Sequence, residues 1–182
     1  RRKAGVEALL LSRIGLDVFP AVILQMMMDR FRTLVVDRIL EDVGKSGMSL
    51  HQVITLASIV EREAKMPEER PRVAAVFLNR IKAGKKLQSC ATVQYALGKV
   101  KPVLSLKDLK VDSPYNTYEH LGLPVGPICS PGIAAIQAVL YPSDDTALFF
   151  VSKGNGWHEF TTSFRLHRKA ANQFEKQREK QR

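Results

Sequence analysis

The segment MSLHQVITLASIVEREAK, residues 48–65, carries the clearest helix signal in the sequence. Ser49 and Gln52 have the spacing of a capping box, in which the two side chains bind the first free N–H groups of a helix. The apolar residues that follow recur with helical periodicity, and Pro67 prevents the helix from continuing. The pattern predicts a helix over residues 49–65 around which the fold is built.

This predicted helix carries two acidic residues, Glu61 and Glu63, on opposite shoulders of its apolar stripe. Residues two apart on a helix do not face each other, so the two cannot act as cooperating carboxylates at one bond. A carboxyl group beside an apolar stripe is partly desolvated, which favours the protonated form that serves as a general acid. The alternative is a solvated glutamate paired with Arg62 or Lys65, and periodicity alone does not choose between the readings.

The rest of the chain adds helices and one pair of strands. Gly, Pro, Ser and Asn make residues 85–130 irregular, with short helices at most, and such a long irregular stretch tends to be functional. Asn155-Gly156 predicts a hairpin turn between two strands, of which the first reads as buried. We expect an α+β fold, mainly helical with a small antiparallel hairpin, whose further elements are helices at 20–43, 70–83, 131–140 and from 163 onward, and strands at 147–152 and 157–161.

The amino-acid composition is that of a globular protein and does not identify a ligand. The chain has 182 residues, of which 45% are hydrophobic and 25% charged, as is typical of a globular domain. Lys and Arg outnumber Asp and Glu by 28 to 18, which gives a formal charge of +10. This excess fits nucleic acid, an anionic membrane or an anionic wall polymer, but no nucleic-acid-binding motif accompanies it.

The sequence contains none of the motifs that would indicate a metal or a cofactor. Cys90 and Cys129 form no CxxC pair and are expected to be unpaired thiols. No P-loop, Gly-rich dinucleotide fingerprint, nucleophile elbow or zinc-protease signature occurs. No run of about 18 apolar residues is present to span a membrane.

Four blocks of sequence together resemble one family. They are LASIVEREA, VAAVFLNRIKAGKKLQSCATVQYALG, DSPYNTYEHLGLPVGPICSPG and LFFVSKGNGWHEFTT, and their order and spacing are similar to those of the YceG-like endolytic murein transglycosylases. The similarity extends over about residues 48–165. The combination of DSPYNTY with the glycine- and proline-rich block after it is specific to that family.

The resemblance implies a lyase that cuts peptidoglycan glycan strands at the β-1,4 bond between N-acetylmuramic acid and N-acetylglucosamine. One Glu would protonate the leaving oxygen, and the muramyl 6-hydroxyl would close on the anomeric carbon to leave a 1,6-anhydro end. No cofactor or metal is implied. The acid falls on Glu63, with Glu61 as the alternative, and family motif positions expected to bind substrate are Asn79, Gln88, Tyr115, Asn116, Tyr118 and His158.

Two departures from the family pattern bear on the site. The family usually has Asp-Pro where this chain has Cys90-Ala91, and a proline where it has Val125. Residues 1–47 are similar only to the end of the family's N-terminal subdomain, so we expect a helical linker there and the catalytic domain at 48–182. The resemblance also implies an envelope location outside the cytoplasmic membrane, with an anchor that precedes this chain, and contact with wall-synthesis enzymes.

Two other functions stay open at this point. A non-catalytic peptidoglycan-binding module would keep the fold without cutting the strand. A basic nucleic-acid-binding domain is suggested only by the net charge, and we expect no nucleic-acid partner.

Overall fold

The computed structural model describes residues 20–180. These residues fall into two compact units that divide between Glu41 and Asp42, inside a helix, and each unit is described by itself. The first contains α2 (Pro20–Phe31), the π-helical turn Arg32–Val36 and the first half of α3 (Asp37–Ser46). The predicted helix at 20–43 is therefore confirmed over its length and continues to Ser46, after which Gly47 takes a φ of +70°.

Helix α4 (Leu50–Glu63) begins as its sequence predicts. The Ser49 hydroxyl accepts a hydrogen bond from the Gln52 N–H at 3.2 Å, and the Gln52 side chain accepts one from the Ser49 N–H at 2.8 Å. The helix ends two residues earlier than predicted, because Ala64 is already in an extended conformation. Its middle is buried on all sides rather than along one stripe, with Val53, Thr55, Leu56, Ala57, Ser58, Ile59 and Val60 inaccessible to solvent.

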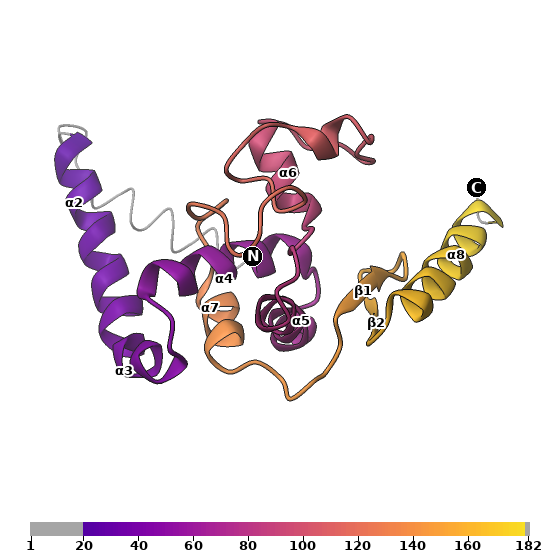
Figure 1. Ribbon diagram of the computed structural model, residues 1–182. Coiled ribbons are helices and arrows are strands. Elements are labelled where there is room, and N and C mark those ends of the chain that lie inside the picture. The colour runs from indigo at the N-terminus through magenta and orange to yellow at the C-terminus, as the bar shows by residue number, and fades with distance from the viewer. Residues whose placement is uncertain (1–19, 181–182) are drawn as a thin grey trace. The chain divides into compact units, whose positions relative to one another are not determined.

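Helices α5 (Arg70–Lys82) and α7 (Ile133–Leu140) pack against α4 and against each other. Figure 1 shows α5 nearly end-on beside α7, both next to the C-terminal part of α4. Gly84 ends α5 in a Schellman motif, with a φ of +62° and a hydrogen bond from the Lys85 N–H to the Arg80 carbonyl at 2.8 Å.

The predicted start of α7 is wrong by two residues. Ser130-Pro131 does not open the helix, because the chain stays extended through Gly132, which is the N-cap. The Gly132 N–H donates to the Glu61 carboxylate at 3.2 Å, and this long-range bond fixes the approach to the helix. A contact between residues 71 apart leaves no local signal in the sequence.

The stretch between α5 and α7 is irregular, as predicted, and holds only α6 (Cys90–Ala96) and the 3₁₀ turn Asp108–Lys110. Part of this loop is fastened across α4. The Ile128 N–H donates to the buried Ser58 hydroxyl at 2.9 Å, and the His51 ring contacts the Val125 carbonyl at 3.0 Å. The loop is therefore held along α4, from its first turn to its middle.

The chain ends with a hairpin and a helix. Strands β1 (Phe149–Ser152) and β2 (His158–Thr161) pair antiparallel through the predicted turn, and α8 (Phe164–Lys180) packs on them. The strands are half-buried rather than buried, because only two strands form this sheet. The α+β prediction is confirmed. Within the described residues, no helix has the length and apolar character needed to cross a membrane.

Candidate active site

The last turn of α4 sends its two glutamates in different directions, as their spacing requires. Glu61 faces the start of α5 and the approach to α7, while Glu63 faces the N-terminal turn of α6. Neither is paired with Arg62 or Lys65, so the solvated-network reading of the sequence is wrong for both. The two carboxylates have separate environments and must be considered separately.

Glu63 is half-buried and is held through one oxygen only. Its Oε1 accepts a hydrogen bond from the Ser89 hydroxyl at 2.5 Å and a longer one from the Ala91 N–H at 3.3 Å. No described residue donates to Oε2. The carboxyl group is thus oriented by fixed donors while its second oxygen remains available for proton transfer.

The donor Ser89 is itself fixed by a small network of buried hydroxyls. Its N–H donates to the Thr117 hydroxyl at 3.0 Å, and its carbonyl accepts from the Thr92 hydroxyl at 2.8 Å. The two threonine hydroxyls lie 2.8 Å apart. Because Ser89 is only 3% exposed, no bulk water competes for the bond to Glu63, and the network preorganises that carboxylate.

Glu63 lines a cavity of about 320 Å³, which we call the Glu63 cavity. A volume in this range suits a small ligand or a segment of a polymer. The walls combine polar groups with apolar and aromatic side chains, a composition that suits the polar and apolar parts of a sugar ring. The lining residues are Glu63, Val76, Phe77, Arg80, Leu87, Gln88, Cys90, Tyr118, Phe149, Phe150, Phe164 and His167.

Gln88 lines the Glu63 cavity in an uncommon backbone conformation and is held there by Arg80. It has a φ of +53°, a left-handed conformation that is uncommon outside glycine. Its N–H donates to the Thr117 carbonyl at 3.0 Å, and its side-chain oxygen accepts from Arg80 at 2.5 Å. Strained residues of this kind cluster at functional sites, where the surrounding contacts hold them.

Arg80 is buried and organises three segments around the Glu63 cavity. Besides Gln88, it donates to the Lys86 carbonyl at 2.8 Å and to the Leu148 carbonyl at 3.0 Å. Its guanidinium carbon lies 5.2 Å from the centre of the Phe149 ring. Burial lowers the pKa of Arg80 from its usual value.

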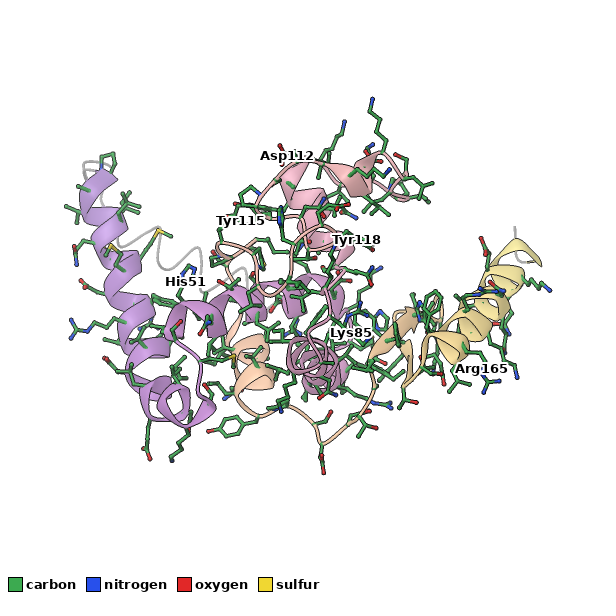
Figure 2. All side chains as sticks on the ribbon, viewed as in Figure 1. His51, Lys85, Asp112, Tyr115, Tyr118 and Arg165 are labelled. Atoms are coloured by element: carbon green, nitrogen blue, oxygen red, sulfur yellow. The ribbon has the colours of Figure 1, made fainter. Side chains whose placement is uncertain are left out.

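Tyr118, labelled in Figure 2, lines the Glu63 cavity next to the first residue of α6. Its hydroxyl lies 3.2 Å from the Cys90 sulfur. Burial raises the pKa of the Tyr118 hydroxyl and the pKa of the Cys90 thiol, so both groups are neutral and protonated near pH 7. They can therefore donate hydrogen bonds but cannot supply a nucleophilic anion.

Glu61 has no free oxygen. Its Oε1 accepts from Arg70 at 2.7 Å in an ion pair that is mostly shielded from solvent, and its Oε2 accepts from Gly132. A carboxylate that joins three elements through both of its oxygens is suited to holding the fold and poorly suited to exchanging a proton. The geometry favours Glu63 over Glu61 as the acid.

The structure places two of the predicted substrate-binding residues away from the Glu63 cavity. Asn116 is 0% exposed, and its amide donates to the Leu109 and Val111 carbonyls at 3.0 and 2.8 Å while its oxygen accepts from the Tyr118 N–H. Tyr115 packs its ring against Tyr95, with centroids 4.7 Å apart. Asn116 therefore shapes the loop that presents Tyr118, and Tyr115 belongs to a different surface.

Asn79 and His158 also make structural contacts. The Asn79 amide donates to the Asp145 and Ala147 carbonyls at 2.6 and 3.1 Å, which holds the segment leading to β1. His158 donates its N–H and presents its Nδ1 to the buried Glu69, at 2.9 and 2.8 Å. Neither residue lines the Glu63 cavity, and contact of either with substrate stays a prediction from the family resemblance.

Two residues that contribute to this site, Ser89 and Arg80, were not predicted from the sequence as site residues. Ser89 could have been recognised as the hydroxyl residue before a short helix, a position that commonly caps helices. Arg80 stands on the apolar face of α5, where a buried arginine indicates specific partners. Among residues 20–180, no group of three His, Cys, Asp or Glu side chains is arranged to hold a metal ion.

The chain is similar to known proteins over most of its length. The model of the YceG-like family matches residues 16–173. The endolytic murein transglycosylase of Bacillus subtilis (strain 168) is 41% identical over 133 residues, which are 73% of this chain and 37% of that protein. The protein of the same name from Streptococcus pneumoniae serotype 2 (strain D39 / NCTC 7466) is 35% identical over 115 residues, 60% of this chain and 21% of its own length.

A solved structure extends the similarity to the fold. The crystal structure of a yceG-like protein from Listeria monocytogenes superposes with a TM-score of 0.81 at 37% sequence identity, over 86% of this chain and 51% of that one. The chain thus spans about half of that structure, and 37% and 21% of the two transglycosylases.

Proposed function

The chain belongs to the YceG-like family, and from this premise we propose that it is a lytic transglycosylase that cleaves peptidoglycan glycan strands from within. The proposal rests on the hydrogen bonds of Glu63 and on its position in the wall of the Glu63 cavity. One of its oxygens is fixed by Ser89 and Ala91, the other receives no hydrogen bond from residues 20–180, and the carboxyl group lines a cavity with both polar and aromatic walls. Two relatives named for this activity support the substrate class.

A single carboxyl group suffices for the proposed reaction, in which the nucleophile belongs to the substrate. Protonated Glu63 gives its proton to the glycosidic oxygen as the bond from that oxygen to the muramyl anomeric carbon breaks. The muramyl 6-hydroxyl then bonds to the same carbon and returns a proton to the Glu63 carboxylate. The products are a free 4-hydroxyl on N-acetylglucosamine and a 1,6-anhydro muramyl end, and no water is consumed.

The spacing of the acidic residues is consistent with this chemistry. A hydrolase of the common kind needs a second carboxylate across the scissile bond, either as nucleophile or to activate water. Glu61, the adjacent candidate, is bound to Arg70 and Gly132 and faces other helices. Gln88 and Tyr118, on the wall of the Glu63 cavity, would hold the sugar through an amide and a neutral phenol.

The reaction proposed here would take place in the cell envelope, where peptidoglycan lies. The location at the outer face of the cytoplasmic membrane, an anchor that precedes this chain, and contact with wall-synthesis enzymes follow from the family resemblance and remain predictions. The chain covers only part of its relatives, so cleavage by this chain by itself is also part of the proposal.

The test is a digest of purified peptidoglycan by the chain and by its Glu63→Gln variant, with products identified by mass spectrometry. We expect anhydro muramyl ends from the parent and none from the variant, while Glu61→Gln serves as the matched control and keeps its activity. Hydrated reducing ends would overturn the water-free mechanism. Binding of strands by the parent without any cleavage would support the non-catalytic module instead.

A further inference from the structure

A second cavity, of about 400 Å³, adjoins the proposed catalytic carboxylate on the other side of α6's first turn. We call it the Arg62 cavity. Ala91 connects the two sites, because its N–H binds Glu63 while its side chain lines this second cavity. The lining residues are Arg62, Ala91, Gln94, Tyr95, Gly98, Lys99, Val100, Ile128 and Cys129.

Three consecutive residues of α4 explain why the two cavities are neighbours. Successive side chains on a helix point about 100° apart, so Glu61, Arg62 and Glu63 spread in three directions. Glu63 lines the first cavity and Arg62 lines the second. A polymer bound across Glu63 would extend into the Arg62 cavity on one side of the scissile bond.

The Arg62 cavity carries positive charge that no acidic lining residue among residues 20–180 neutralises. Arg62 and Lys99 line it, and no acidic residue does. Neither cation forms an ion pair with a carboxylate of residues 20–180. The nearby Glu61 is already bound to Arg70, and Glu63 acts in its protonated form in the proposed reaction. An anionic group entering this cavity would therefore meet two unpaired cations.

The remaining walls suit a sugar ring beside that anion. Tyr95 is 46% exposed, and its ring is held in place by packing against Tyr115. A fixed, accessible tyrosine offers an apolar face together with a polar hydroxyl. Gln94 adds an amide at the same wall, with only a long 3.4 Å bond to the Lys101 carbonyl.

We propose that the Arg62 cavity binds a carboxylate carried by the muramyl residue next to the scissile bond. The inference rests on the proposed function, because it takes a peptidoglycan strand as the ligand. On such a strand, the carboxylate is supplied by the stem peptide or, where the peptide has been removed, by the lactyl group. Arg62 would bind it through paired N–H donors and Lys99 as a point charge.

The experiment measures binding of uncut glycan strands to the chain carrying Glu63→Gln, so that its readout does not depend on cleavage. Three strand preparations are compared: peptide-bearing strands, strands stripped of peptide by an amidase, and peptide-bearing strands whose carboxylates have been converted to amides. The test variant adds Arg62→Gln and Lys99→Gln. The control adds Arg165→Gln and Arg168→Gln, an equal change of charge on exposed positions of α8, where Figure 2 shows Arg165.

We expect the test variant to bind peptide-bearing strands at least about tenfold more weakly than the control, since two charge-assisted contacts are lost. On amidated strands the two should bind equally. A loss on stripped strands as well, whose lactyl carboxylate is free, would show that the cavity accepts that group too, and no loss there would restrict it to the stem peptide. Equal affinity for peptide-bearing strands, or an equal loss on amidated strands, would overturn the inference.

The same measurements separate this inference from the proposed function. If the chain with Glu63 intact cuts no strand but the binding pattern holds, the proposed reaction is wrong and the carboxylate site stands. If the strands are cut and the binding pattern fails, the site is wrong and the reaction stands.

Discussion

Removing the hydroxyl of Ser89 should slow the proposed reaction without unfolding the protein. This hydroxyl donates to Glu63 Oε1 at 2.5 Å, and the serine is only 3% exposed, so water does not replace the lost donor. A hydrogen bond to a charged group contributes about 1.5–3 kcal/mol. Each 1.36 kcal/mol corresponds to about a tenfold change in rate. We therefore expect Ser89→Ala to lower kcat about 10- to 100-fold, towards the lower end because the Ala91 N–H remains.

The assay follows the release of anhydro muramyl ends over time at several strand concentrations, so that kcat and KM are separated. KM should change little, because Ser89 does not line the Glu63 cavity and contacts substrate only through Glu63. Ser105→Ala is the matched control: its hydroxyl also donates to a carboxylate, that of Asp108 at 2.7 Å, but far from this site. It should leave kcat unchanged.

A comparison of rate with stability makes the reasoning refutable. Urea unfolding should show that Ser89→Ala destabilises by only about 1 kcal/mol. A kcat equal to that of the parent, or a loss of rate explained by unfolding, would show that Ser89 does not position the acid.

Three further predictions concern residues outside the acid itself. Glu61→Gln removes the ion pair with Arg70 and should cost about 1–3 kcal/mol in urea unfolding, with kcat of the folded protein unchanged; a large loss of kcat in folded protein would move the acid to Glu61. Asn116→Ala leaves two partly buried carbonyls without this donor and should cost about 1–3 kcal/mol; a change within experimental error would contradict the role assigned to this amide. Burial lowers the pKa of His167 below 6.5, so the unfolded chain binds this proton more readily, and stability should be full above pH 6.5 and fall as the pH drops below it. His167→Gln should flatten that part of the pH–stability curve, and curves of equal slope would show that His167 does not contribute.

The local elements could be predicted because their determinants are local. The capping box at Ser49 and Gln52 consists of two residues three positions apart, and both bonds are present in the structure. The chain reversal around Asn155-Gly156 is likewise local, although it takes place in the five-residue loop 153–157, where Gly154 and Gly156 rather than Asn155 have positive φ values, of 93° and 94°. Signals of this kind do not depend on what the rest of the chain does.

The assembly of the site could not be predicted in the same way. Helical periodicity placed Glu61 and Glu63 on opposite shoulders, but the choice between them depends on partners 9 and 71 residues from Glu61 and 26 residues from Glu63. Residue type was also an incomplete guide to function. Asparagine commonly binds sugars, yet the side-chain amide of Asn116 donates its hydrogen bonds to two backbone carbonyls. What a polar side chain does is decided by which backbone groups the fold leaves unpaired around it.

The family resemblance implies a proline where this chain has Ala91, and the two residues differ in what they can donate to Glu63. A proline has no N–H, whereas Ala91 donates one to Oε1 at 3.3 Å. If the family's chemistry is carried out with proline at this position, the amide donor is not required for it. The shorter bond from the Ser89 hydroxyl then becomes the contact on which the orientation of the acid depends. A short helix can begin with proline or alanine at this position, so we expect this difference to change how strongly the carboxylate is held and not the fold that presents it.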